Sequence, residues 1–112
     1  MINSYEFGMI VVNGKKYYSD VIIYPDKVDD QWWRKEGHLL VPQDLEKVVK
    51  AKPEILIVGT GNWGMMKVPS STQRWVKSQG IQLRIEPTQN ACQVYNQVFQ
   101  SKRTVAALHL TC

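Results

Sequence analysis

The spacing of apolar residues changes once along the chain, and this change limits the fold more than any other feature. Up to about residue 24 the apolar residues recur with a period of two, which is typical of strands. From residue 54 onward, short apolar runs alternate with stripes at helical spacing. We therefore expect an α/β fold, in which an N-terminal β-hairpin precedes a strand–helix–strand–helix–strand unit. The 112 residues have the length of one domain, and we expect residues 1–112 to form it.

The hairpin is predicted from the pair Asn13-Gly14, which tolerates a positive φ at both central positions of a type I′ turn. The first strand is expected over residues 5–12, where alternate side chains share one face. The return strand is expected over residues 16–24 and carries apolar groups on both faces, so we expect the hairpin to be packed on two sides. Pro25 ends it.

About three helices are expected in the remainder. Residues 26–37 have no periodic pattern, and Pro42 is well placed to open a helix over residues 43–51. A capping box at Ser70 and a cap at Thr88 are predicted to open the other two helices. The elements expected after Pro53 are a strand at 54–58, a helix at 70–80, a strand at 81–85, a helix at 88–100 and a strand at 104–111.

Composition excludes several classes of protein. The chain is 44% hydrophobic and 21% charged, as in ordinary soluble domains, and its net charge of +4 comes from basic residues that do not cluster in the sequence. We therefore expect no nucleic-acid partner. Apolar runs such as Met9–Val12 are too short to cross a membrane, and two cysteines rule out a disulfide-rich fold. The start of the chain has no targeting signal, so we expect a cytoplasmic protein without a membrane partner.

The segment Gly59–Gly64 fits the dinucleotide-binding pattern G-x-G-x-x-G directly after a predicted strand. In a dinucleotide fold the helix begins inside this motif and its N-terminus meets the pyrophosphate. Here that helix would contain Pro69, and the capping signals place its start at Ser70. We therefore expect an ordinary tight turn. One alternative stays open, in which Gly59, Gly61, Lys67 and Ser70 together hold a small anion.

The cluster Trp32-Trp33-Arg34 is the strongest candidate for a binding surface. One tryptophan is expected to anchor the core, whereas Trp33, beside Arg34 and His38, has the composition of an interface or a pocket wall. Packing alone remains the alternative. Trp63, in the glycine-rich loop, is expected to be exposed and could belong to the same surface.

The cysteines and histidines do not predict a catalytic or metal site. Strand alternation places His109 and Cys112 on opposite faces, and Cys92 lies on the apolar stripe of its helix. No spacing of the two histidines and two cysteines matches a metal site. We expect no cofactor and no metal.

Several short motifs together resemble the adipogenesis-associated Mth-domain-containing protein family, whose domain is shared with mitochondrial assembly factors of respiratory complex I. These motifs are Trp33–Gly37, Gly59-x-Gly61, Lys67–Thr72, Gly80-Ile81, Val94–Asn96 and His109-x-Thr111-Cys112. The resemblance implies a single Mth-like domain with three layers around a central mixed sheet, in a small prokaryotic or archaeal member of unknown function. It implies no reaction, and Gly64 is not part of the family pattern.

These observations favour a non-catalytic protein-binding or assembly module over an enzyme. The expected binding face joins the Trp32–His38 loop to the Gly59–Ser70 loop, and Trp33→Ala or Arg34→Ala is expected to leave folding largely intact while abolishing capture of a partner. The alternative is a protein or enzyme that binds a small anion in a cleft between the same loops. The candidate residues for either function are Trp33, Arg34, His38, Gly59, Gly61, Lys67 and Ser70.

Overall fold

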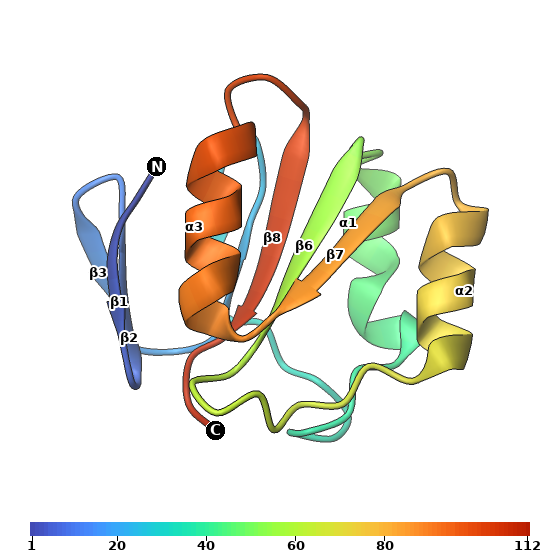
Figure 1. Ribbon diagram of the computed structural model, residues 1–112, viewed down its shortest axis with the longest axis horizontal. Helices are drawn as coiled ribbons and strands as arrows, with labels where there is room; N and C mark the ends of the chain where they lie inside the picture. The colour runs from blue at the N-terminus through green and yellow to red at the C-terminus, as the bar shows by residue number, and fades with distance from the viewer.

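The chain forms three layers around a mixed five-stranded sheet in a computed structural model that describes residues 1–112 (Figure 1). The elements are β1 (Ile2–Glu6), β2 (Met9–Val12), β3 (Lys15–Tyr17), β4 (Val21–Ile23), β5 (Val28–Asp29), a 3₁₀ turn (Pro42–Leu45), α1 (Glu46–Lys50), β6 (Ile55–Thr60), α2 (Ser70–Ser78), β7 (Gln82–Glu86), α3 (Thr88–Val98) and β8 (Thr104–His109). The α/β class and the central mixed sheet are confirmed. No helix is both long and apolar enough to span a membrane.

The main sheet has the strand order β5-β4-β8-β6-β7. The pairs β6–β7 and β6–β8 are parallel, whereas β4 is antiparallel to both β8 and β5. The helices α2 and α3 are the crossovers between the parallel strands, as parallel pairing requires. All loops that follow the carboxyl ends of β6 and β8 therefore lie at one end of the sheet.

Apolar cores fill both faces of this sheet. Ile55 and Ile57 of β6 pack with α3 and the small β1–β2–β3 sheet, whereas Leu56 and Val58 pack with α1 and α2. Every residue of β6 and β8 is buried. This explains the continuous apolar runs in the sequence, since a strand covered on both faces needs apolar side chains at every position.

The N-terminal hairpin was predicted only in part. The turn at Asn13-Gly14 is confirmed, with φ values of 49° and 81°. The single strand expected over residues 5–12 is wrong, because a second turn at Gly8, where φ is 79°, divides it into β1 and β2. The expected return strand also divides, since β3 ends at Tyr17 and β4 joins the main sheet. Asp20 lies in the break between β3 and β4 and belongs to the functional region described below.

The starts of α2 and α3 were predicted correctly, but their caps were not, and the helix expected over residues 43–51 is a 3₁₀ turn followed by the short α1. The helices α2 and α3 begin at Ser70 and Thr88, yet the capping positions are Pro69 and Pro87, and neither helix has a side-chain cap. The hydroxyl of Thr88 instead donates to the carbonyl of His109 at 2.6 Å and accepts from the backbone N–H of Gly61 at 2.8 Å. The start at Ser70 leaves no helix in the glycine motif and excludes the dinucleotide-binding interpretation.

Candidate functional site

The loop after β6 and the turn between β1 and β2 meet on the last residues of the chain, at the carboxyl ends of β6 and β8 (Figure 1). The backbone N–H of Asn62 donates to the carbonyl of Thr111 at 2.6 Å, and that of Met65 to the carbonyl of Cys112 at 2.9 Å. The N–H of Gly8 donates to the carbonyl of Leu110, also at 2.9 Å. We call this region the loop face; it comprises residues 7–8, 18–20, 31–38, 61–67 and 110–112.

A buried polar cluster lies beneath the loop face. The carboxylate oxygen Oδ2 of Asp20 lies 2.8 Å from Nη2 of Arg34 and 2.8 Å from Nδ1 of His109. The other oxygen, Oδ1, accepts the backbone N–H of Leu110 at 2.8 Å. The side chain of Arg34 is only 5% exposed and that of Asp20 17%. This ion pair therefore joins the β3–β4 break, the Trp32–His38 loop and the end of β8.

The Asp20 carboxyl is held in its charged form. Burial alone would raise its pKa, but hydrogen bonds from His109 and Leu110, with the charges of His109 and Arg34, outweigh burial and lower the pKa. An ionised carboxylate only accepts hydrogen bonds, so the proton between it and His109 resides on Nδ1. The Nε2 atom of His109 is buried without any hydrogen-bond partner.

Arg34 also fixes the conformation of its own loop. Its Nε and Nη2 donate to the carbonyl of Gly37 at 3.1 and 2.9 Å, and its guanidinium lies 4.7 Å from the ring centre of the buried Trp32. Trp33, the residue between them, points outward with 84% of its surface exposed. The expectation that one of the two tryptophans anchors the core is confirmed for Trp32. Arg34 is instead part of the internal structure, and we therefore now expect Arg34→Ala to destabilise the fold.

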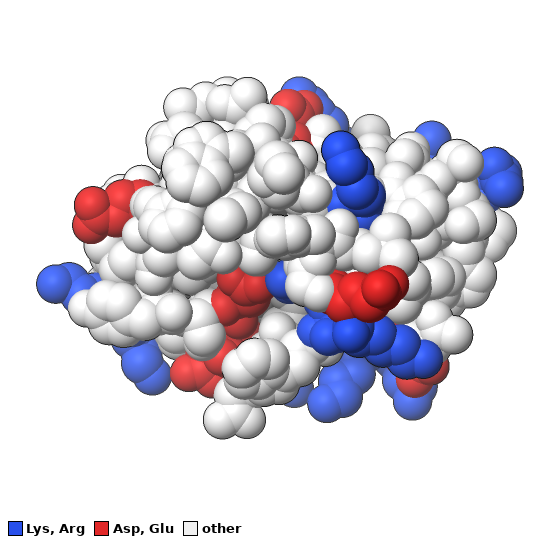
Figure 2. Space-filling model, turned by 90° about the horizontal axis from the view of Figure 1, so that it is seen from below, with Lys and Arg blue, Asp and Glu red and all other residues white.

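Exposed apolar side chains gather on the loop face. It carries five of the six large apolar side chains that the structure leaves exposed, namely Phe7, Tyr18, Trp33, Trp63 and Met65. The rings of Phe7 and Trp63 pack together with 5.2 Å between their centres. A groove of about 340 Å³ runs between Tyr18 and Trp33, with Asp20 and Thr111 in its lining. Figure 2 views this side, where uncharged residues cover most of the surface and both acidic and basic groups show between them.

The two loops predicted to border a cleft are paired with each other instead. The N–H of Lys67 donates to the carbonyl of His38 at 2.7 Å, and the N–H of Leu40 to the carbonyl of Lys67 at 2.9 Å. No pocket is lined by both loops. The expected cleft is therefore absent, because these backbone hydrogen bonds close it. His38 and Lys67 are exposed, and the His38 ring lies edge-on to His109 at 5.6 Å.

The two glycines of the candidate set occupy closely packed positions. A Cβ on Gly59 would lie 2.8 Å from side-chain atoms of Leu108 and Thr88, and one on Gly61 would overlap the backbone of Cys112. Gly61 also has a φ of 107°. Close approach of the chain explains both glycines. Ser70, the remaining candidate, is exposed at the first residue of α2 and contributes no side-chain hydrogen bond.

Several residues of this site were missed from the sequence. Asp20 lay inside an expected strand, Thr88 was assigned to a helix cap, and Phe7 and Tyr18 were assigned to packed strand faces. The missed break after Tyr17 was the common cause for Asp20 and Tyr18, because no glycine or proline marks it. An aspartate within an otherwise apolar strand pattern was the one available signal.

The cysteines are free, and Cys92 is buried, which raises the pKa of its thiol to about 12. No group of three or more His, Cys, Asp or Glu side chains is arranged to hold a metal ion. The Nε2 atom of His109 has no partner, so the thiol of Cys112 does not form a dyad with it. The site therefore offers a buried ion pair and an apolar surface.

Comparisons with known proteins agree with this fold. The chain is 25% identical over 109 residues to rat (Rattus norvegicus) NADH dehydrogenase (ubiquinone) 1 alpha subcomplex assembly factor 3, covering 95% of the chain but 57% of that protein. A conserved hypothetical protein from Pyrococcus horikoshii OT3 superposes with a TM-score of 0.85 at 27% identity, covering 100% and 99% of the two chains. A Bordetella pertussis protein described as a Mth938-like domain superposes at 0.69 with 20% identity, covering 98% and 85%, which shows the fold alone.

These matches confirm the resemblance to Mth-domain proteins and to complex I assembly factors that the sequence motifs indicated. The chain spans a little over half of the length of the rat assembly factor. A family described as "protein of unknown function (DUF498/DUF598)" matches residues 2–110. Because this match covers nearly all of the chain, the protein belongs to the DUF498/DUF598 family.

Proposed function

We propose that this protein is a non-catalytic protein-binding module, of the kind that serves assembly, and that it binds its partner through the loop face. The observation that carries the proposal is the gathering of five exposed apolar side chains on one face. Exposed tryptophan, tyrosine, phenylalanine and methionine are the residues enriched in protein interfaces. Isolated apolar groups on a surface need no explanation, but the contacting rings of Phe7 and Trp63 and the groove between Tyr18 and Trp33 on one face support a binding site.

The polar cluster beneath this face supports a structural role better than a catalytic one. Asp20 orients His109 as a carboxylate orients a general base, but a general base must reach the proton that it removes. The Nε2 atom of His109 is buried and has no nucleophile beside it. The pair Asp20–Arg34 instead holds the loop that presents Trp33.

The relatives are consistent with this proposal. The curated relative is named as an assembly factor, and the sequence covers 57% of it, so partners of the rat protein are not transferred to this chain. We treat residues 1–112 as one Mth-like domain, because both apolar cores share the main sheet. Two free cysteines fit the reducing conditions of the cytoplasm, where we place the protein.

The experiment is a quantitative pull-down from an extract of the source cells, comparing the wild type with Trp33→Ala and Trp63→Ala. We expect both variants to keep the wild-type unfolding midpoint and to lose the captured partner. The matched control is Lys77→Ala/Gln79→Ala, two exposed residues on and after α2, which is expected to capture as the wild type does. Equal capture by all of these proteins would contradict the proposal.

A further inference from the structure

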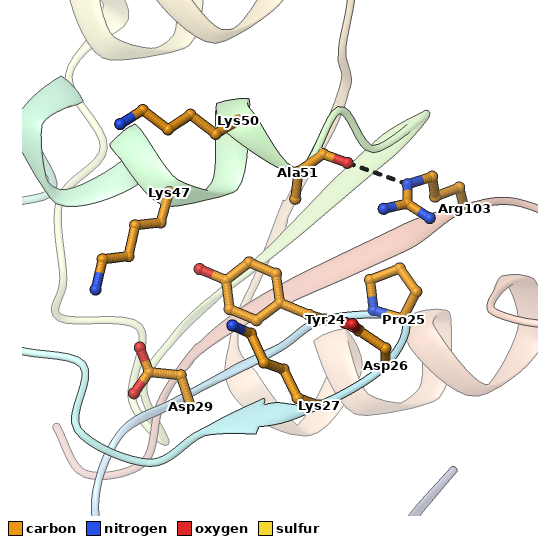
Figure 3. Close-up of a pocket in the computed structure, with 9 residues that line it drawn as sticks. All are labelled: Tyr24, Pro25, Asp26, Lys27, Asp29, Lys47, Lys50, Ala51 and Arg103. Atoms are coloured by element: carbon orange, nitrogen blue, oxygen red, sulfur yellow. Dashed lines mark hydrogen bonds between the residues drawn. The ribbon is translucent and has the colours of Figure 1, made fainter.

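The largest pocket lies at the opposite end of the main sheet from the loop face. It has a volume of about 630 Å³ and is formed by the β4–β5 turn, the end of α1 and the residue that precedes β8 (Figure 3). Its lining residues are Tyr24, Pro25, Asp26, Lys27, Asp29, Lys47, Lys50, Ala51 and Arg103. The six residues of β8 lie between this pocket and the end of β8 at the loop face, and a smaller pocket that contains Tyr24, Asp29 and Lys47 extends to Trp33.

Four cations line this pocket against two carboxylates. None of Lys27, Lys47, Lys50 and Arg103 forms an ion pair in the structure. Basic residues that do not cluster in the sequence therefore meet at this place in the fold. Unpaired cations around a concavity concentrate positive potential there and attract anions.

Arg103 is held in a position from which it can bind a ligand. Its Nε donates to the carbonyl of Ala51 at 3.1 Å, the hydrogen bond drawn in Figure 3. This is its one side-chain hydrogen bond, so both terminal nitrogens keep their donors available. A guanidinium fixed in this way offers the planar, two-pronged donor geometry that suits phosphate oxygens.

Tyr24 supplies a buried hydroxyl without a partner. The residue is 7% exposed, and its hydroxyl oxygen has no hydrogen bond. In Figure 3 this hydroxyl points toward the part of α1 that carries Lys47, while the ammonium of Lys27 lies 5.4 Å from the centre of the ring. Burial, with the charge of Asp29, raises the pKa of Tyr24, so the hydroxyl keeps its proton and remains a donor at neutral pH.

We propose that this pocket binds a small phosphate-bearing anion, such as a phosphomonoester or pyrophosphate. The unpaired cations offset two or more negative charges, and the Arg103 guanidinium and the Tyr24 hydroxyl donate to phosphate oxygens. A volume of this size is ordinary for a small-molecule site. The proposal does not depend on the protein-binding role of the loop face.

The test is an NMR titration of the ¹⁵N-labelled protein with inorganic phosphate and with pyrophosphate, at fixed ionic strength. We expect saturable shifts of the amides at 24–29, 47–51 and 103, with no shifts at residues 7–8, 61–67 and 110–112 of the loop face. Lys47→Gln/Lys50→Gln is expected to weaken binding about tenfold, since two charge contacts are lost. The control Lys16→Gln/Lys77→Gln, exposed lysines elsewhere with the same loss of charge, is expected to bind as the wild type does.

The variant Tyr24→Phe distinguishes a loss of affinity for the anion from a loss of protein stability. Removing an unpaired buried hydroxyl is expected to leave the unfolding midpoint unchanged or higher, while affinity for pyrophosphate falls about fivefold. A non-saturating response, shifts outside the pocket, or equal weakening in both lysine variants would overturn the proposal, because it would show diffuse attraction of anions to a basic protein.

Discussion

Asp20 and Arg34 form a buried ion pair, with 2.8 Å between Oδ2 and Nη2, although they come from different segments of the chain. Arg34 also binds the carbonyl of Gly37 and lies over Trp32. The pair thus connects the β3–β4 break to the loop that exposes Trp33. A surface loop held by a buried ion pair presents its side chains in one arrangement, which reduces the entropy lost on binding a partner.

Replacing Arg34 should destabilise the fold. Arg34→Ala leaves the Asp20 carboxylate without its cation, and breaking such a pair costs about 3 kcal/mol, the lower end of the usual range because Asp20 is partly exposed. Urea denaturation measures the change. Lys35→Ala, at an exposed neighbouring position, should change the free energy of unfolding by less than about 0.5 kcal/mol. Similar free energies of unfolding for the two variants would show that the ion pair does not stabilise the fold.

The same pair predicts a dependence of stability on pH. The folded state lowers the pKa of Asp20 below its ordinary value of 3.8, so its contribution is complete above that value and is lost as the pH falls through the folded pKa. The wild type should therefore lose its advantage over Asp20→Asn in acid. Unfolding free energies of both proteins between about pH 2 and pH 6 test this. A constant difference across that range would contradict the assignment of the charge.

Substitution by alanine should destabilise the protein far more at Gly61 than at Gly80. Both have a positive φ, 107° and 79°, but a Cβ on Gly61 would overlap the backbone of Cys112, whereas Gly80 faces open space. Gly61→Ala should cost at least about 2 kcal/mol more than Gly80→Ala, since backbone must move to make room. Thermal unfolding of the two variants provides the comparison. Equal losses would mean that conformational strain alone explains both glycines.

Much of the fold could be predicted because its signals are local. The continuous apolar run at 55–58 marks a strand covered on both faces, and Asn13-Gly14 marks a hairpin turn. Pro69 forced the start of α2 to Ser70. The division of the N-terminal strands could not be predicted in the same way. The alternation of side chains continues unchanged on both sides of Gly8, so the sequence pattern does not reveal the turn there.

The candidate site was less accessible to prediction because it depends on contacts between distant residues. Trp63 was expected at the surface from its place in a glycine-rich loop, and it lies there. The burial of Arg34 depends on Asp20 and His109, which are 14 and 75 residues away in the chain. Likewise, the pairing of Lys67 with His38 closes the expected cleft, and no local pattern encodes it.

Oxidative footprinting of the free protein and of the protein captured with its partner tests the binding role of the loop face most directly. Met65 and Met1 have similar exposure, 49% and 54%, but only Met65 lies on the loop face. On capture, oxidation of Met65, Trp33 and Trp63 should slow severalfold while Met1 reacts as before. If Met65 and both tryptophans react as quickly in the complex as in the free protein, the loop face is not the binding surface.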